Sequence, residues 1–187
     1  YASFLFITKS LEYTGALQYP IEGHSSFESV ADHIEIASLD ALACVPSWLV
    51  QFSKWATEKN LQFSEIKTIY TGGELLFPEQ LTHYLKVFPE ARVTSIGCAS
   101  VDAGLIGFAT PDCKLNEHRV FSDDTTLEII DEKTSEPILE AGKAGKIYVT
   151  NFSRKVMAIE RYPVGDLGMW IDEDESTPNR KFLILGR

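Results

Sequence analysis

The sequence predicts an α/β fold in which a parallel-sheet subdomain is followed by an antiparallel, β-rich, barrel-like subdomain. Residues 39–108 alternate between amphipathic and short β-branched stretches, which is typical of βα units around a parallel sheet. After about residue 110, short apolar stretches are separated by connections rich in Gly, Pro and Asp, which indicates antiparallel strands. We expect residues 1–110 to form the first subdomain and residues 111–187 the second.

The first α/β elements lie before a pair of glycines. Apolar residues recur at helical spacing over residues 39–60, so we expect a helix there, interrupted near Pro46. Residues 66–70 are apolar and β-branched and predict a short buried strand, which Gly72-Gly73 ends.

The next helix begins at Pro78, because proline is tolerated in the first turn of a helix. Residues 91–96 then predict a second strand. Ligands of parallel sheets bind outside the carboxyl ends of the strands, so the segments after both strands are candidate binding loops. In the β-rich part we expect strands over residues 126–130, 146–150, 168–171 and 182–185.

Composition excludes several classes of protein. The net charge of −10 argues against non-specific nucleic-acid binding, which needs a basic face. Three scattered cysteines form neither a disulfide framework nor a zinc motif, so we expect a reduced, cytoplasmic protein. The sequence has no apolar run of the roughly 20 residues that a membrane-spanning helix needs, and we expect no membrane association. The four histidines have no metal-binding spacing.

Three short segments contain residue types that suit nucleotide chemistry. Gly72-Gly73 lets a flat ligand approach the backbone, although a simple turn needs the same residues. In the segment after the second strand, Ser100 can donate to a phosphoryl oxygen and Asp102 can hold Mg²⁺ beside phosphate oxygens. The alternative is a helix or turn cap.

The third segment contains Gly165-Asp166, and Arg187 ends the chain. Asp166 can accept both hydroxyls of a ribose, as acidic residues do in dinucleotide sites, or it can belong to a hairpin turn. Arg187 can pair with a phosphate, with a ribose or with Asp166 itself.

Taken together, Ile69–Glu74, Cys98–Gly104 and Arg161–Leu167 resemble the acyl-adenylate-forming superfamily of acyl-CoA synthetases, peptide adenylation domains and luciferases. The similarity covers about residues 40–187. Gly72–Leu76 and Arg161–Leu167 are most similar to the phenylacetate–CoA ligase branch, which handles aryl acids. A further likeness is to an adenylating protein of phenazine antibiotic assembly that acts on griseoluteic acid.

The resemblance implies a role for each segment. Gly72, Gly73 and Glu74 line the adenine, Asp166 binds the ribose, and Arg187 lies just before the hinge to a C-terminal domain.

The family's Tyr-Gly-x-Thr-Glu loop falls on Cys98, Ala99, Ser100, Val101 and Asp102. This register assigns nucleotide binding to residues 98–101, catalytic roles to Ser100 and Asp102, and Mg²⁺ to Asp102. It replaces the family's aromatic ring by Cys98 and its threonine by Val101. A rival register over residues 96–100 keeps a glycine but loses the carboxylate.

The implied protein is an adenylate-forming ligase that uses ATP and Mg²⁺ to convert a carboxylic acid, an aryl acid by resemblance, into an acyl-adenylate. The acceptor is CoA, a carrier-protein thiol or an amine. The phosphate loop is expected before Tyr1 and the catalytic lysine after Arg187, so the fragment alone is expected to be inactive. Two alternatives stay open: a degenerate homologue that binds AMP or acid without turnover, and an unrelated scaffold protein.

Overall fold

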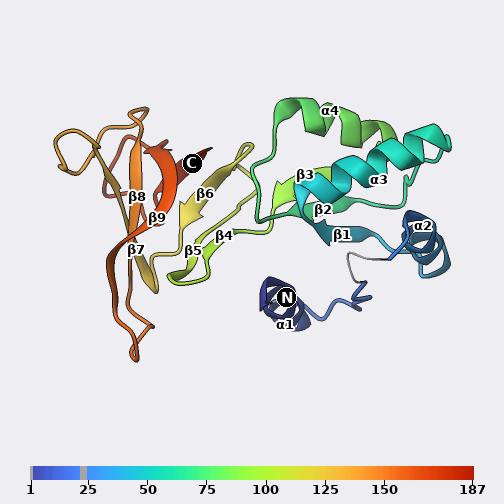
Figure 1. Cartoon of the computed structure of the whole chain (residues 1–187), viewed down its shortest axis with the longest axis horizontal. Helices are drawn as coiled ribbons and strands as arrows, with labels where there is room; N and C mark the ends of the chain where they lie inside the picture. The colour runs from blue at the N-terminus through green and yellow to red at the C-terminus, as the bar shows by residue number, and fades with distance from the viewer. Residues whose placement is uncertain (1, 22–24) are drawn as a thin grey trace. The chain divides into compact units, whose positions relative to one another are not determined.

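The computed structural model describes residues 2–21 and 25–187 and contains two units, Tyr1–Leu39 and Asp40–Arg187. The first unit holds two helices, α1 (Ala2–Glu12) and α2 (Phe27–Ile36) (Figure 1). Helix α2 begins at Ser26, whose hydroxyl accepts the Ser29 N–H at 3.2 Å and so satisfies one of the free donors of the first turn. The second unit contains both sheets.

The first sheet of the second unit is parallel, with strand order β1-β2-β3. Strands β1 (Ala41–Cys44), β2 (Thr68–Thr71) and β3 (Arg92–Ser95) alternate along the chain with helices α3 (Pro46–Glu58) and α4 (Pro78–Val87). In Figure 1 both helices run along one side of the three strands, and they pack against each other. This arrangement confirms the predicted parallel βα subdomain.

The predicted helix over residues 39–60 is wrong in its first part. Ala41–Cys44 forms strand β1, which pairs with β2 from Ala41↔Thr68 onward, and the helix begins only at Pro46. Val45 is extended (φ −83°, ψ 146°), because a residue before proline avoids the helical region. The other three predicted elements of this subdomain are confirmed as β2, α4 and β3.

Three phenylalanines form the aromatic centre of the α/β core. Phe52, Phe63 and Phe88 have ring centroids 5.6–6.0 Å apart and exposed fractions of 0–1%. Full burial of each ring contributes roughly 1.5–3 kcal/mol. The Tyr84 hydroxyl donates to the Pro46 carbonyl oxygen at 2.9 Å, so the buried phenol of α4 is satisfied by the first turn of α3.

The second sheet has seven strands in the order β4-β5-β6-β10-β9-β8-β7, and all of its neighbouring strands are antiparallel. Its core includes Ile106, Ile147 and Phe182, which are 0–2% exposed. This confirms the β-rich subdomain. The strands are β4 (Cys98–Ser100), β5 (Gly104–Phe108), β6 (Glu117–Val120), β7 (Thr125–Ile130), β8 (Gly145–Asn151), β9 (Ile159–Trp170) and β10 (Lys181–Gly186).

The antiparallel sheet differs from the expectation in extent. Its first three strands were not expected, and β9 is longer than the predicted strand over residues 168–171 because it also includes residues 159–167. The parallel sheet ends at Ser95 and the antiparallel sheet begins at Cys98, whereas the subdomain boundary at 110/111 stays a prediction. Among the described helices, none has the length and apolar character needed to cross a membrane.

Candidate functional site

A cavity of about 720 Å³ opens where the carboxyl ends of β2 and β3 meet the antiparallel sheet. Its position agrees with the general rule for ligands of open α/β sheets. Four parts of the chain contribute most of its wall: residues 71–77, residues 92–95 with 97–99, residues 113–118, and residue 166 of β9 with residues 184, 186 and 187 at the end of β10.

The loop after β2 contains the predicted adenine-binding residues, and all three line the cavity. A Cβ at Gly72 would lie 2.7 Å from Ile96 Cγ2, and Gly73 has a φ of 79°, so both positions favour glycine. The carboxylate of Glu74 accepts the Ser47 N–H at 2.9 Å and the Ser47 hydroxyl at 2.7 Å. Glu74 therefore caps helix α3, whose own N-cap residue makes no side-chain bond.

A serine and a buried histidine meet across the two sheets. Ser95 Oγ lies 2.7 Å from His118 Nε2 and accepts the Gly97 N–H at 3.0 Å. His118 Nδ1 lies 3.1 Å from the Asn116 carbonyl oxygen, so the tautomer with a proton on Nδ1 satisfies both ring nitrogens. Burial lowers the pKa of His118 to about 4, so the ring is neutral at pH 7.

Asn116 forms hydrogen bonds through its side chain with the loop of residues 72–77 between β2 and α4, which we call the glycine loop. Its Oδ1 accepts the Leu76 N–H at 3.1 Å and its Nδ2 donates to the Leu76 carbonyl oxygen at 2.9 Å. Its own carbonyl accepts the Ile184 N–H of β10 at 3.2 Å. Ser95, Asn116 and His118 all line the cavity and were missed by the sequence reasoning, because no local pattern marks hydrogen bonds between two sheets.

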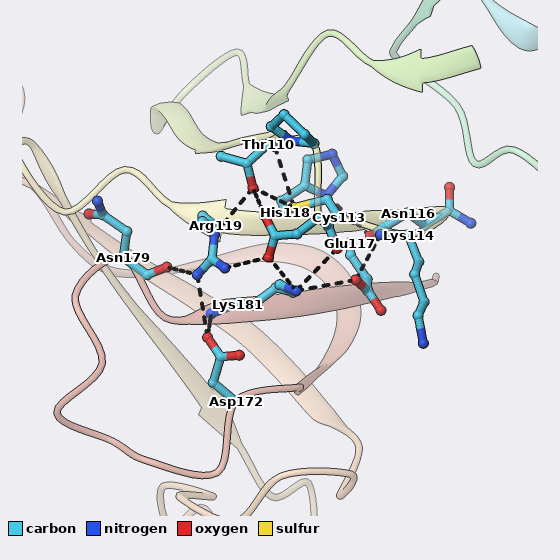
Figure 2. A network of polar contacts seen from close by, with 12 residues as sticks. Thr110, Cys113, Lys114, Asn116, Glu117, His118, Arg119, Asp172, Asn179 and Lys181 are labelled. Carbon is cyan, nitrogen blue, oxygen red and sulfur yellow. Dashed lines mark hydrogen bonds and ion pairs between the residues drawn. The ribbon is translucent and has the colours of Figure 1, made fainter. Parts of the chain in front are cut away.

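Ion pairs fix the segment that contains Asn116 and His118 (Figure 2). Asp112 pairs with Arg119 Nη2 at 2.6 Å and with Lys181 Nζ at 2.9 Å, and Lys181 lies 3.8 Å from Glu117. Hydrogen bonds from Thr110, Lys181 and Arg119 hold the pKa of Asp112 far below its usual range. The network thus ties the connection before β6 to β10.

Asp166 and Arg187 reach the cavity from neighbouring strands. Gly186 pairs with Leu167, which places Arg187 Nε 3.1 Å from Asp166 Oδ1. The Arg187 side chain is 84% exposed, so this pair contributes little to stability. Burial, followed by the nearby Asp166 charge, raises the pKa of the Cys98 thiol to about 12. Cys98 is therefore a neutral thiol at the cavity wall.

The remaining predicted residues do not belong to the cavity wall. Ser100, the last residue of β4, and Val101 and Asp102, in the turn between β4 and β5, lie outside its lining. Asp102 Oδ2 accepts the Tyr162 hydroxyl at 2.6 Å, and this bond raises the pKa of Tyr162. Ser100 Oγ accepts the Ala103 N–H at 3.4 Å. Their catalytic roles stay predictions.

The structure therefore brings together only part of the predicted site: Glu74 and Asp166 line the cavity, and Asp102, the predicted Mg²⁺ ligand, does not. Across residues 2–21 and 25–187, no group of three or more His, Cys, Asp or Glu side chains could hold a metal ion. The magnesium role of Asp102 stays a prediction. The members that line one cavity are Gly72, Gly73, Glu74, Cys98, Ala99, Asp166 and Arg187.

The same fold occurs in solved structures of ligases and of a luciferase-like enzyme. The chain matches 2-hydroxyisobutyryl-CoA ligase in complex with 2-HIB-AMP and CoA with a TM-score of 0.73 and 20% identity, covering 92% of this chain and 37% of that chain. A luciferase-like enzyme from the mealworm Zophobas morio matches with a TM-score of 0.64 and 18% identity over 87% of this chain and 42% of that one.

A long-chain-fatty-acid-CoA ligase from Archaeoglobus fulgidus matches with a TM-score of 0.63 and 18% identity, over 87% of this chain and 37% of the ligase. The chain thus spans about two fifths of the length of the structures it matches. No protein-family model matches the sequence, and neither does any curated protein. At these identities the similarity establishes the fold.

Proposed function

We propose that the chain is part of an enzyme that uses ATP to activate a carboxylic acid, with an aryl acid as the substrate class. A carboxylate oxygen of the acid attacks the α-phosphorus of ATP, the bond from that phosphorus to the bridging oxygen breaks, and pyrophosphate leaves. The acyl group of the resulting mixed anhydride then passes to CoA, to a carrier-protein thiol or to an amine. In this reaction the residues of the chain would act by positioning and by charge neutralisation.

The observation that carries this proposal is the convergence of three distant stretches on one cavity. The loop with Gly72 and Gly73, strand β4 with Cys98 and Ala99, and strand β9 with Asp166 all contribute to its wall. The loop with Gly72 and Gly73 forms one part of that wall, and Asp166 provides an acceptor suited to ribose hydroxyls. The solved structure with the highest TM-score quoted above was determined in complex with 2-HIB-AMP and CoA.

Magnesium is the weaker part of the fit. Asp102 is exposed, and its carboxylate accepts the Tyr162 hydroxyl, so Mg²⁺ would compete with that hydrogen bond. Mg²⁺ usually binds one or two carboxylates and completes its shell with phosphate oxygens and water. We keep Asp102 as the proposed ligand of phosphate-bound Mg²⁺, which it could bind only by releasing the Tyr162 hydroxyl and from a position outside the cavity lining.

Calorimetry with AMP tests the proposal directly. Asp166→Ala should weaken AMP binding by roughly 1–3 kcal/mol, because it removes charged hydrogen bonds to the ribose. Asp174→Ala is the matched control, since Asp174 is an exposed aspartate of the β9–β10 connection outside the cavity. If wild type binds neither AMP nor a non-hydrolysable acyl-adenylate, the proposal fails. Equal affinity of Asp166→Ala and wild type refutes the ribose role.

A second function, binding of AMP or of an acid without turnover, has its own supporting observation. The position of the family's adenine-covering tyrosine holds Cys98, whose neutral, partly buried thiol offers no aromatic face. Pyrophosphate exchange by the full-length protein with a panel of aryl acids separates the two functions. Exchange supports activation, whereas AMP binding without exchange supports the non-catalytic homologue.

A further inference from the structure

We infer that Asn116 is a positioning residue that sets the glycine loop of the candidate nucleotide site, an inference that rests on the function proposed above. The side-chain amide of Asn116 pairs with both the N–H and the carbonyl oxygen of Leu76, at 3.1 and 2.9 Å. The two hydrogen bonds resemble the pair that two facing residues exchange in an antiparallel sheet, with the Asn116 amide in place of one backbone. It anchors the loop that contains Gly72, Gly73 and Glu74 to the segment just before β6.

Asparagine suits this position for two reasons. Its φ of 60° lies in the left-handed region, which asparagine tolerates better than most residues. Its short amide also presents an acceptor and a donor side by side, as the two polar groups of Leu76 require. Leu76 is 3% exposed, so its N–H and carbonyl would lose these partners in a site with little access to water.

The backbone carbonyl of Asn116 makes further contacts with other walls of the cavity. Its carbonyl oxygen accepts the Ile184 N–H of β10 at 3.2 Å and faces His118 Nδ1 at 3.1 Å. His118 in turn contacts Ser95, which bonds to the Gly97 N–H. In Figure 2 the Asn116 amide points away from the ion pairs that fix its own segment.

Asn116 therefore contacts the glycine loop and strand β10 directly, and the turn after β3 through His118 and Ser95. Only the first of these contacts uses the Asn116 side chain, so substitution isolates it. Asn116→Gly removes the amide and keeps the backbone conformation, because glycine adopts positive φ freely. The wall formed by β10 and the Ser95–His118 contact stays in place, and the loop at Leu76 alone loses its anchor.

The test compares amide hydrogen exchange at Leu76 with AMP affinity in the 187-residue chain. In Asn116→Gly we expect faster exchange at Leu76 and an AMP Kd about three- to tenfold higher than in wild type. In wild type, AMP should slow exchange at Leu76, because coupling between binding and loop order is reciprocal.

Ile129→Val controls for a general loss of stability. Ile129 is 1% exposed in the antiparallel core and lies outside the cavity lining, so its truncation weakens the fold without touching the loop. This variant should keep wild-type AMP affinity and wild-type exchange at Leu76. The same AMP affinity in Asn116→Gly and wild type, with fast exchange at Leu76, overturns the inference. So does an equal loss of AMP affinity in the control.

Failure of the proposed function gives a different pattern. If wild type binds no AMP, no role of Asn116 in nucleotide binding survives, and the inference falls with the function. The exchange rate of the Leu76 amide still reports whether the anchor exists. Slow exchange of the Leu76 amide in wild type and fast exchange in Asn116→Gly would then show that Asn116 holds the loop in place but has no role in nucleotide binding.

Discussion

Acidification should weaken the fold through one buried side chain, His118. Its ring is 4% exposed, and burial lowers its pKa from the ordinary 6.5 to about 4. Between these two values the unfolded chain binds a proton that the native chain does not. The contribution of the neutral His118 ring to the free energy of unfolding is therefore fully present above pH 6.5, and it is lost as the pH falls toward 4. From pH 7 to pH 5, the free energy of unfolding should drop by about 2 kcal/mol from this group.

Urea unfolding at pH 7 and pH 5, followed by tryptophan fluorescence, measures this drop. His118→Gln is the matched variant, because the amide keeps a polar group near Ser95 Oγ and has no proton to gain. The variant should lose about 2 kcal/mol less than wild type over the same pH change. The other histidines are present in both proteins, so they cancel in the comparison. An equal loss in wild type and variant would refute the reasoning.

Two further substitutions test separate contacts, and both are measured by urea unfolding at pH 7. Glu74→Ala removes the cap of α3 at Ser47 and should lower the free energy of unfolding by about 1 kcal/mol. Glu74→Gln should lower it less, because its amide oxygen still accepts the Ser47 N–H. Equal losses in the two variants would contradict the capping role. Gly168→Ala should cost about 1–3 kcal/mol, because the added Cβ would lie 2.7 Å from Ile147 Cδ1 and 2.9 Å from the Leu183 carbonyl oxygen. A wild-type midpoint for Gly168→Ala would show that the strands at this position separate easily.

The sequence predicted those elements whose signals are local. Pro78 fixes the start of α4, and the glycine pair ends β2, so these boundaries follow from backbone chemistry. Residues 41–44 were assigned to a helix because Leu39, Leu42 and Leu49 recur at helical spacing. The strand there is decided by pairing with β2, which lies beyond the reach of a local pattern.

Strands β4, β5 and β6 were missed for a different reason. Residues 98–108 include Gly104 and Gly107, which weaken a strand signal, and Glu117–Val120 is polar. Glu117 and His118 are nevertheless buried, because ion pairs and hydrogen bonds across sheets satisfy them. Such polar strands become recognisable only when their distant partners are known.

In the candidate site, too, residues marked by local patterns were predicted, and a residue that depends on a distant partner was not. The proximity of Gly72, Gly73 and Cys98 was predicted, since residues that follow adjacent parallel strands share an edge of the sheet. Asp166 lies within antiparallel strand β9, and its place beside them was expected only from the family resemblance. Asn116 was not predicted, because its function in the fold depends on the backbone of one particular residue forty positions earlier in the chain.

The cavity has one wall on each sheet, and this has a thermodynamic consequence. A small molecule that touches both walls adds its binding free energy to the docking of two separate hydrophobic cores. Without it, hydrogen bonds such as those of Asn116 and the Ser95–His118 contact are among the groups that hold the cores together. At a saturating ligand concentration, the two sheets should therefore unfold together in one thermal transition that is sharper than the transition of the ligand-free chain. Removing the ligand should reverse this coupling.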